Sequence, residues 1–172
     1  LVSVINDVLD LSKVDAGKLP LLAKQFNLMT LLNKLHELHI PASHSKGLTL
    51  YLDYDPAVPR EFIGDAGRLR QITHNIIGNA IKFTSEGYVM VSVRGRRVSD
   101  THMTVNFYVR DTGKGIEPEN LNRIFERFEQ VVDQEGSHAQ GTGLGLAISK
   151  ELIETMGGSM KAESILGEGT MF

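Results

Sequence analysis

Residues 71–84 have the sequence QITHNIIGNAIKFT, in which apolar and polar residues recur at helical spacing. The apolar residues predict a helix with one face packed on a core: Ile72, Ile76, Ile77, Ala80 and Phe83. The other face carries amides, because Gln71, Asn75 and Asn79 follow each other at i, i+4 and i+8, and Lys82 comes next. Amide oxygens are suitable ligands of Mg²⁺, and the ammonium group of a lysine one turn along the helix can reach phosphates that coordinate the same ion. A solvated helix face is the simpler explanation when the stretch is taken alone.

The composition is that of an ordinary globular domain. The 172 residues are 41% hydrophobic and 23% charged, with a net charge of −3, so one compact domain is expected and nucleic acid is not an expected partner. The absence of cysteine excludes disulfides and thiolate chemistry and suits a cytoplasmic location. No apolar run approaches the roughly 18 residues of a membrane span, so we expect no membrane contact. Because the chain starts at Leu1 and stops within apolar residues, we interpret it as a fragment of a longer protein.

The residues before 71 predict alternating helices and short strands. Near-heptad apolar spacing over residues 1–17 predicts an amphipathic helix that ends at Gly17. A short strand is expected at 26–28, then a helix from Leu28 to Pro41. Alternation over 48–52 predicts a half-buried strand, and 61–63 a short extended segment that leads to Asp65 as helix N-cap.

The residues after 84 predict paired strands followed by loops and one more helix. Residues 89–93 and 103–109 alternate and are expected to pair as antiparallel neighbours around Ser99 and Asp100. A short helix is expected at 118–125, a longer one at about 144–156, and a strand at 160–165. This order predicts an α+β sandwich with helices on one face of a mixed sheet.

Three glycine-bearing segments follow the amide-bearing helix: DTGKGI at 111–116, GTGLGL at 141–146 and GEGT at 167–170. Glycine lets backbone N–H groups approach a ligand where a Cβ would collide. The second segment leads into a helix N-terminus, which favours phosphate binding. Its spacing is neither that of a P-loop nor that of a dinucleotide fingerprint, and a flexible connector remains the alternative.

Asp111 ends an apolar strand, where a carboxylate is costly unless it has a partner. A purine amino group would supply one, in a charge-assisted hydrogen bond of roughly 1.5–3 kcal/mol. The alternative is an ordinary aspartate that starts a turn with Gly113.

Five segments together resemble the N, G1, F, G2 and G3 boxes of the catalytic ATP-binding domain of sensor histidine kinases: 71–84, 111–116, IFERFEQ at 124–130, 141–146 and GEGTMF at 167–172. This superfamily includes DNA gyrase, mismatch-repair ATPases and heat-shock chaperones. Residues 5–19 resemble the end of the second dimerisation helix, most like that of the hybrid type. The resemblance implies a Bergerat-type two-layer α/β sandwich over 20–172, with its final strand cut short, preceded by a remnant of the dimerisation hairpin over 1–19.

The resemblance also implies ATP and Mg²⁺ as cofactors and assigns roles to residues. Asn79 would coordinate Mg²⁺ with Asn75 beside it, while Lys82 and Arg127 would face the phosphates. Asp111 would bind the adenine amino group. The other implied contacts to nucleotide are Gly113, Gly115, Ile116, Gly141, Thr142, Gly143, Leu144, Gly145, Leu146 and Thr170. Phe125 and Phe128 would anchor a lid, in which His138 is the one basic residue between 135 and 140.

The phosphoacceptor is expected upstream of Leu1. Residues 36–41, HELHIP, imitate the family's acceptor box but follow the dimerisation segment instead of preceding it. They also fail the H-E-x-x-H zinc spacing, because His39 is at i+3. We therefore interpret His36, His39 and His44 as ordinary helix and loop residues. His74 has no explanation from the sequence.

The expected function is to bind Mg·ATP and to donate the γ-phosphoryl group to a histidine of the dimerisation domain, in two-component signal transduction. The expected partners are that domain and a downstream response-regulator receiver domain, with the fragment a monomer and the full-length protein a homodimer. One alternative is an ATPase clamp of the same superfamily, which would want an acidic residue where Asn75 stands. The other is a nucleotide-sensing pseudokinase module that binds ATP without transfer.

Overall fold

The computed structural model describes residues 19–129 and 142–172. Their helices and strands follow in the order β1 (Lys24–Asn27), α2 (Leu28–Ser45), β2 (Thr49–Tyr54), β3 (Glu61–Gly64), α3 (Ala66–Phe83), β4 (Tyr88–Arg97), β5 (Met103–Asp111), the 3₁₀ helices η1 (Pro118–Asn120) and η2 (Arg123–Phe125), α4 (Gly145–Thr155), β6 (Glu163–Ile165) and β7 (Gly169–Met171). The helix expected at 1–17 and the domain boundary near residue 19 depend on residues outside these ranges, so both stay predictions.

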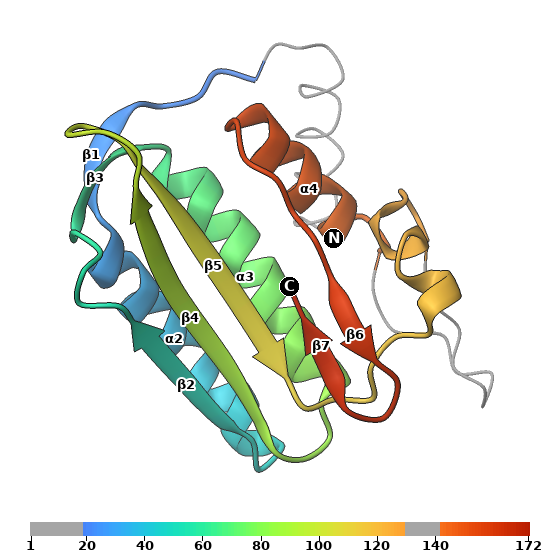
Figure 1. Cartoon of the computed structure of the whole chain (residues 1–172). Coiled ribbons are helices and arrows are strands. Elements are labelled where there is room, and N and C mark those ends of the chain that lie inside the picture. The colour runs from blue at the N-terminus through green and yellow to red at the C-terminus, as the bar shows by residue number, and fades with distance from the viewer. Residues whose placement is uncertain (1–18, 130–141) are drawn as a thin grey trace.

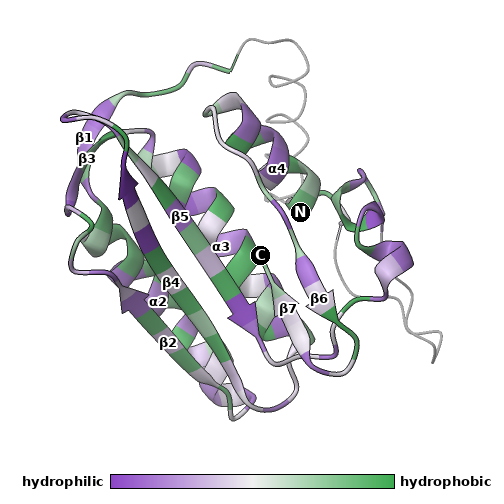
Figure 2. Cartoon of the chain, viewed as in Figure 1, coloured by the Kyte–Doolittle hydropathy of each residue, from purple (hydrophilic) through white to green (hydrophobic). Residues whose placement is uncertain are grey.

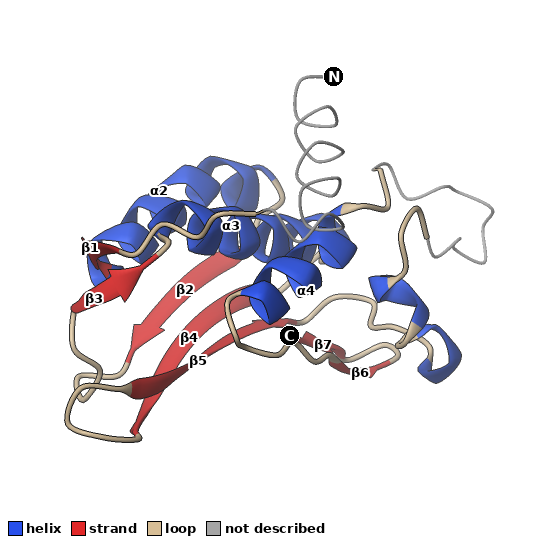
Figure 3. Ribbon diagram, turned by 90° about the horizontal axis from the view of Figure 1, so that it is seen from above, coloured by secondary structure: helices blue, strands red, loops and turns tan. Residues whose placement is uncertain are grey.

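Five strands form one mixed sheet in the order β2-β4-β5-β7-β6 (Figure 1). β2 runs parallel to β4, whereas the other neighbouring pairs are antiparallel. β1 and β3 make a separate two-stranded antiparallel sheet. Helices α2, α3 and α4 lie on the same side of the large sheet (Figure 3). The expected α+β sandwich with helices on one face of a mixed sheet is therefore confirmed.

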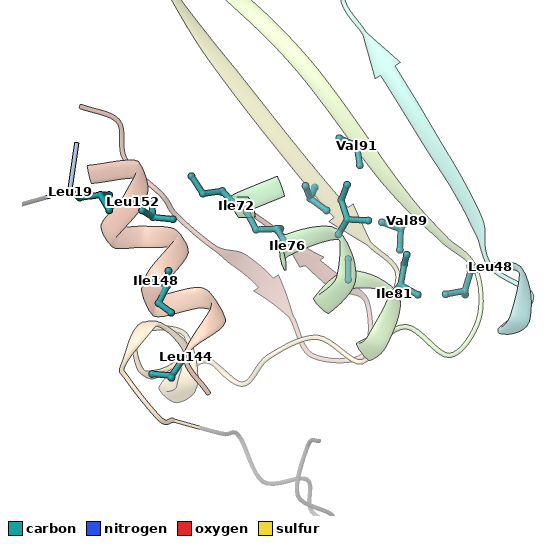
Figure 4. Packing of buried hydrophobic residues seen from close by; sticks show 13 residues of the cluster. Leu19, Leu48, Ile72, Ile76, Ile81, Val89, Val91, Leu144, Ile148 and Leu152 are labelled. Carbon is teal, nitrogen blue, oxygen red and sulfur yellow. The ribbon is translucent and has the colours of Figure 1, made fainter. Parts of the chain in front are cut away.

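The core lies between the helices and the inner face of the sheet. Figure 4 shows Ile72 and Ile76 of α3 lying between Leu152 of α4 and Val89 of β4. Leu152 and Val89 are fully buried, and each such aliphatic side chain contributes roughly 1.5–3 kcal/mol. A second cluster packs α2 on the other half of the sheet: Leu28, Leu31, Leu32, Leu35, Val58 and Val93. Strands β4 and β5 change between hydrophobic and hydrophilic along their length, as expected for a sheet covered on one face (Figure 2).

The predicted stripe of the amide-bearing helix is buried apart from its last member. Ile72, Ile76, Ile77 and Ala80 belong to the core. Phe83 is only half-buried, with the Nζ atoms of Lys82 and Lys114 lying 4.8 and 5.2 Å from its ring centroid. The helix is also longer than the stretch suggested, because it starts at Ala66. Asp65 is its N-cap, as predicted, and accepts a hydrogen bond from Arg68 N at 3.0 Å.

Helix α2 does not end at Pro41 but continues to Ser45, so that prediction was wrong. Proline removes one backbone donor and crowds the preceding turn, which usually ends a helix. Here the burial of Ser43 shows that the last turn is held by tertiary packing. The Oγ of Ser43 adds a local hydrogen bond to the carbonyl of Ile40 at 2.9 Å. The helix expected at 118–125 appears as two 3₁₀ turns, and the strand expected at 160–165 is confined to its last three residues, Glu163–Ile165.

Two histidines meet where α2 packs on α3. The rings of His39 and His74 have centroids 4.7 Å apart and planes tilted by 33°. His39 is 6% exposed, and its Nε2 has no hydrogen-bond partner in the part of the chain that the structure describes. Burial, and then the neighbouring His74, lower the pKa of His39 to about 4. The contact accounts for His74 and makes His39 an interior group rather than an ordinary helix residue.

Residues 19–129 and 142–172 contain neither a candidate membrane span nor a candidate metal cluster. None of the described helices is both long enough and apolar enough to pass through a lipid bilayer. No group of three or more histidine, aspartate or glutamate side chains in these ranges is arranged to hold a metal ion.

Candidate functional site

Asp111 lies at the end of β5 and is 5% exposed. Its Oδ1 accepts hydrogen bonds from the backbone N–H of Gly113 at 2.8 Å and of Thr170 at 3.3 Å. Burial raises the pKa of Asp111, and the two N–H donors oppose that shift. The described residues donate no hydrogen bond to Oδ2, so one oxygen of a buried carboxylate is left for another donor.

Gly113 brings the loop after β5 against the end of α3. A Cβ at this position would lie 2.5 Å from the carbonyl oxygen of Phe83 and 2.8 Å from Asp111 Oδ1. The neighbouring Lys114 N–H donates to the same Phe83 carbonyl at 3.4 Å. A larger residue at 113 would push the loop away from the helix. Gly115 completes the loop at φ +72 and packs on the backbone of Ile165.

Ser164, which the sequence analysis did not single out, joins three segments behind Asp111. Its hydroxyl donates to the carbonyl of Gly169 at 2.8 Å and accepts from Ile116 N–H at 2.8 Å. Because its single proton is used, the Thr170 hydroxyl at 2.9 Å must donate to it. The Thr170 side chain is thus turned toward Ser164, and its backbone N–H is what reaches Asp111. No local motif marks Ser164, because Ile116 lies 48 residues away in the sequence and the contacts with Gly169 and Thr170 depend on the pairing of β6 with β7.

The polar residues of α3 have different surroundings. Gln71 accepts a hydrogen bond from Arg68 at 2.9 Å, and Asn75 donates from Nδ2 to Ser149 Oγ of α4 at 3.0 Å. Asn79 is partly exposed, and its side-chain amide forms no hydrogen bond with any described residue. Partial burial, and then the nearby Lys114, lower the pKa of Lys82. Asn79 therefore has the most available amide in the predicted row.

The N-terminus of α4 lies against the middle of α3. A Cβ on Gly145 would stand 2.4 Å from Asn75 Oδ1, so any larger residue at 145 would displace the side-chain amide of Asn75. Within the described ranges no side chain caps this helix, and its first turn contains no acidic residue. Its first N–H groups and positive dipole end are thus open to an anion. Leu144 is buried and its N–H donates to Thr142 Oγ1 at 3.3 Å, while Leu146 in the first turn is partly exposed.

The segment after η2 is tied to α4. Arg127 donates from Nε and Nη2 to Glu151 Oε1 at 3.0 and 2.8 Å, an ion pair that the sequence analysis missed. Phe128 is 67% exposed at φ 65, and its N–H donates to the carbonyl of Gly143 at 3.0 Å. Phe125 meets the ring of Phe172 edge to face. The predicted contacts at Gly141 and His138 lie outside the described residues.

Comparisons with known proteins identify the family to which this fold belongs. The family model for "Histidine kinase-, DNA gyrase B-, and HSP90-like ATPase" matches residues 64–172. Over its full 172 residues the chain is 41% identical to the signal transduction histidine-protein kinase BarA of Escherichia coli (strain K12), of which it covers 19%. It is 39% identical to hybrid signal transduction histidine kinase B of Dictyostelium discoideum, of which it covers 9%. The structure of full-length ShkA in complex with AMPPNP aligns over 99% of this chain and 34% of that chain, with 36% identity and a TM-score of 0.83.

The fold is that of an ATP-binding domain of the histidine kinase type. The chain belongs to the histidine kinase-, DNA gyrase B- and HSP90-like ATPase family, which confirms the resemblance carried by its five boxes. It spans 19% and 9% of the length of the two curated relatives.

Proposed function

We propose that the chain binds Mg·ATP and donates the γ-phosphoryl group to a histidine of a dimerisation domain in the longer protein, as part of two-component signalling. The observation that carries the proposal is the Asp111 carboxylate, which is buried, held at one oxygen by two backbone N–H groups, and without a partner at the other among the described residues. Family membership and the AMPPNP complex of ShkA support an adenine nucleotide as the ligand.

At the base end, Asp111 Oδ2 would accept a hydrogen bond from the exocyclic amino group of adenine. Such a charge-assisted bond is worth roughly 1.5–3 kcal/mol, and guanine would place a carbonyl acceptor against the carboxylate instead. Gly113 and Gly115 have no side chain and so allow this loop to pack closely on the neighbouring backbone. Ile116 is held by the hydrogen bond from its N–H to Ser164 Oγ. The backbone N–H of Thr170 holds the carboxylate, and its hydroxyl, which donates to Ser164, would keep lone pairs to accept from a water beside the base.

At the phosphate end, the residues fit a magnesium-bound triphosphate. Asn79 would be the protein ligand of the metal, because its amide has no hydrogen bond from the described residues. Asn75 Oδ1 faces Gly145 and would be the second ligand. Gly143, Gly145 and Leu146 would present N–H groups to the phosphates, with Lys82 adding positive charge. Mg²⁺, when bound, neutralises negative charge that develops on the phosphates.

Transfer of the phosphoryl group asks the protein chiefly for positioning and charge stabilisation, so a nucleophile on this chain is not required. His36 Nε2 lies 2.9 Å from the carbonyl oxygen of Leu50 and His39 is buried, so neither histidine of HELHIP is presented as an acceptor. We propose that the phosphoacceptor histidine lies on the dimerisation domain. A response-regulator receiver domain would then take the phosphoryl group from that histidine. We further propose that this part of the protein lies in the cytoplasm and that the full-length protein, whether or not a membrane anchor is present elsewhere in it, is a homodimer.

The base contact is tested by the affinity of Asp111→Asn for Mg·ATP and Mg·GTP, measured by calorimetry. A loss of roughly 1.5–3 kcal/mol predicts about 10- to 150-fold weaker ATP binding and a smaller preference for ATP over GTP. Asp100→Asn is the control, because Asp100 is exposed in the turn between β4 and β5. Unchanged ATP affinity in Asp111→Asn would falsify the adenine role.

The second candidate function is a module that binds ATP without transferring it. It is favoured by the ion pair between Arg127 and Glu151, because Glu151 competes with phosphates for the N–H donors of this arginine. Adding a separately made acceptor domain together with Mg·ATP separates the two functions. Phosphohistidine on the acceptor supports the kinase, whereas tight ATP binding with no phosphohistidine supports the pseudokinase.

A further inference from the structure

Lys46, the residue after α2, reaches across to the end of α3. Its Nζ donates hydrogen bonds to the carbonyl oxygens of Ile81 at 2.8 Å, Lys82 at 2.7 Å and Thr84 at 3.0 Å. An ammonium group has three donors, so all three are used. Lys46 lies outside residues 64–172, the part of the chain that the family model matches.

These bonds complete the hydrogen bonding of the α3 C-terminus. The last four carbonyls of a helix, here those of residues 80–83, have no partner within the helix. The Ala80 carbonyl accepts from Thr84 Oγ1 at 2.7 Å, and the Phe83 carbonyl accepts from Lys114 N–H at 3.4 Å. Lys46 supplies the other two, and its positive charge lies at the negative end of the helix dipole.

The same turn of α3 leads directly to the candidate base site. The Phe83 carbonyl packs on Gly113, and the Gly113 N–H holds Asp111 Oδ1 at 2.8 Å. Lys82, expected at the phosphates, lies in this turn as well. A shift of the helix end would therefore move the support of the Asp111 carboxylate.

We propose that Lys46 is a positioning residue of the nucleotide site: it fixes the last turn of α3, which in turn fixes the loop of Gly113 and Lys114 under Asp111. This inference rests on the proposed function where it concerns nucleotide, but the positioning itself is a property of the chain alone. If Lys46 acted only as a helix cap, its removal would lower the stability of the whole chain and would not loosen the loop of Gly113 and Lys114 selectively.

The test uses the 172-residue chain with Lys46→Met, which keeps the length of the side chain and removes the three donors. Amide hydrogen exchange at Gly113 and Lys114, without nucleotide, should accelerate by about tenfold, while exchange in the centre of β4 and α3 should change much less. ATP affinity should fall about tenfold. Lys34→Met, on an exposed face of α2, is the matched control and should change neither quantity.

Equal acceleration of exchange at all slow amides would overturn the inference, because it would reveal a purely global loss of stability. Unchanged exchange at Gly113 and Lys114 would overturn it as well. If Lys46→Met does not fold, Lys46→Gln replaces it, because glutamine retains part of the hydrogen bonding. Its exchange rates at Gly113 and Lys114 are compared in the same way with those in the centre of β4 and α3. Failure of the unmodified chain to bind ATP would refute the proposed function, yet the exchange data would still decide the role of Lys46.

Discussion

Acidification should destabilise the protein through His39, because this ring is buried next to His74 and must stay neutral. The pKa of His39 is about 4 in the folded chain and 6.5 when unperturbed, so between these values the unfolded state binds more protons than the folded state. Stability therefore falls as pH drops through 6.5, and the loss is complete below pH 4. The full difference amounts to about 3 kcal/mol, of which about 2 kcal/mol is lost between pH 7.5 and pH 5.

Urea unfolding at pH 7.5 and pH 5 measures this loss, with His39→Leu as the test variant. The leucine removes the titrating group from the α2–α3 contact, so its loss between the two pH values should be smaller by about 2 kcal/mol. His44→Leu makes the same change at an exposed position of α2, and its free energy of unfolding should fall between the two pH values by as much as that of the unmodified protein. Equal pH dependence in His39→Leu and the unmodified chain would refute the reasoning, as would an NMR titration that placed the pKa of His39 near 6.5.

Three further predictions concern the candidate site. Asn79→Ala should remove most of the Mg²⁺ dependence of ATP affinity, because the described residues leave its amide available to the metal; titrations with and without Mg²⁺ that show unaltered dependence would contradict the assignment. Ser164→Ala should lower the free energy of unfolding by about 1–3 kcal/mol in urea, because Ile116 N–H and the Thr170 hydroxyl lose their partner. Ser159→Ala, at an exposed position, is its control, and equal effects of the two changes would argue against the network. Glu151→Gln should weaken the pairing with Arg127 and raise ATP affinity severalfold, with stability changed by less than about 1 kcal/mol. Unchanged affinity would indicate that Arg127 does not approach the phosphates.

Features that depend on neighbours in the sequence could be predicted. The apolar spacing of residues 71–84 located α3, and alternation located β4 and β5 with their antiparallel pairing. Asp65 was recognisable as an N-cap because capping acts within a single turn. Asp111 was recognisable because a carboxylate that ends an apolar strand needs a partner.

Features that depend on distant partners could not be predicted. Ser164 and Lys46 lie in segments with no local motif. The bond from Ile116 N–H to Ser164 and those of Lys46 to the end of α3 join residues that are far apart in the chain. The continuation of α2 through Pro41 depends on tertiary packing of its last turn, which overrides the local preference of proline. The pairing of Arg127 with Glu151 likewise requires the placement of α4 beside η2.

Helix α3 links the two ends of the candidate site to one core element. Its middle carries Asn75, which is bonded to Ser149 and packed on Gly145 at the start of α4. Its end carries the Phe83 carbonyl, which packs on Gly113 below Asp111. The spacing between the expected phosphate and base contacts is therefore set by a rigid helix, because Ile76, Ile77 and Ala80 fix that helix in the core. A substitution that shifts α3 in the core should consequently weaken nucleotide binding even when none of the proposed contacts is changed.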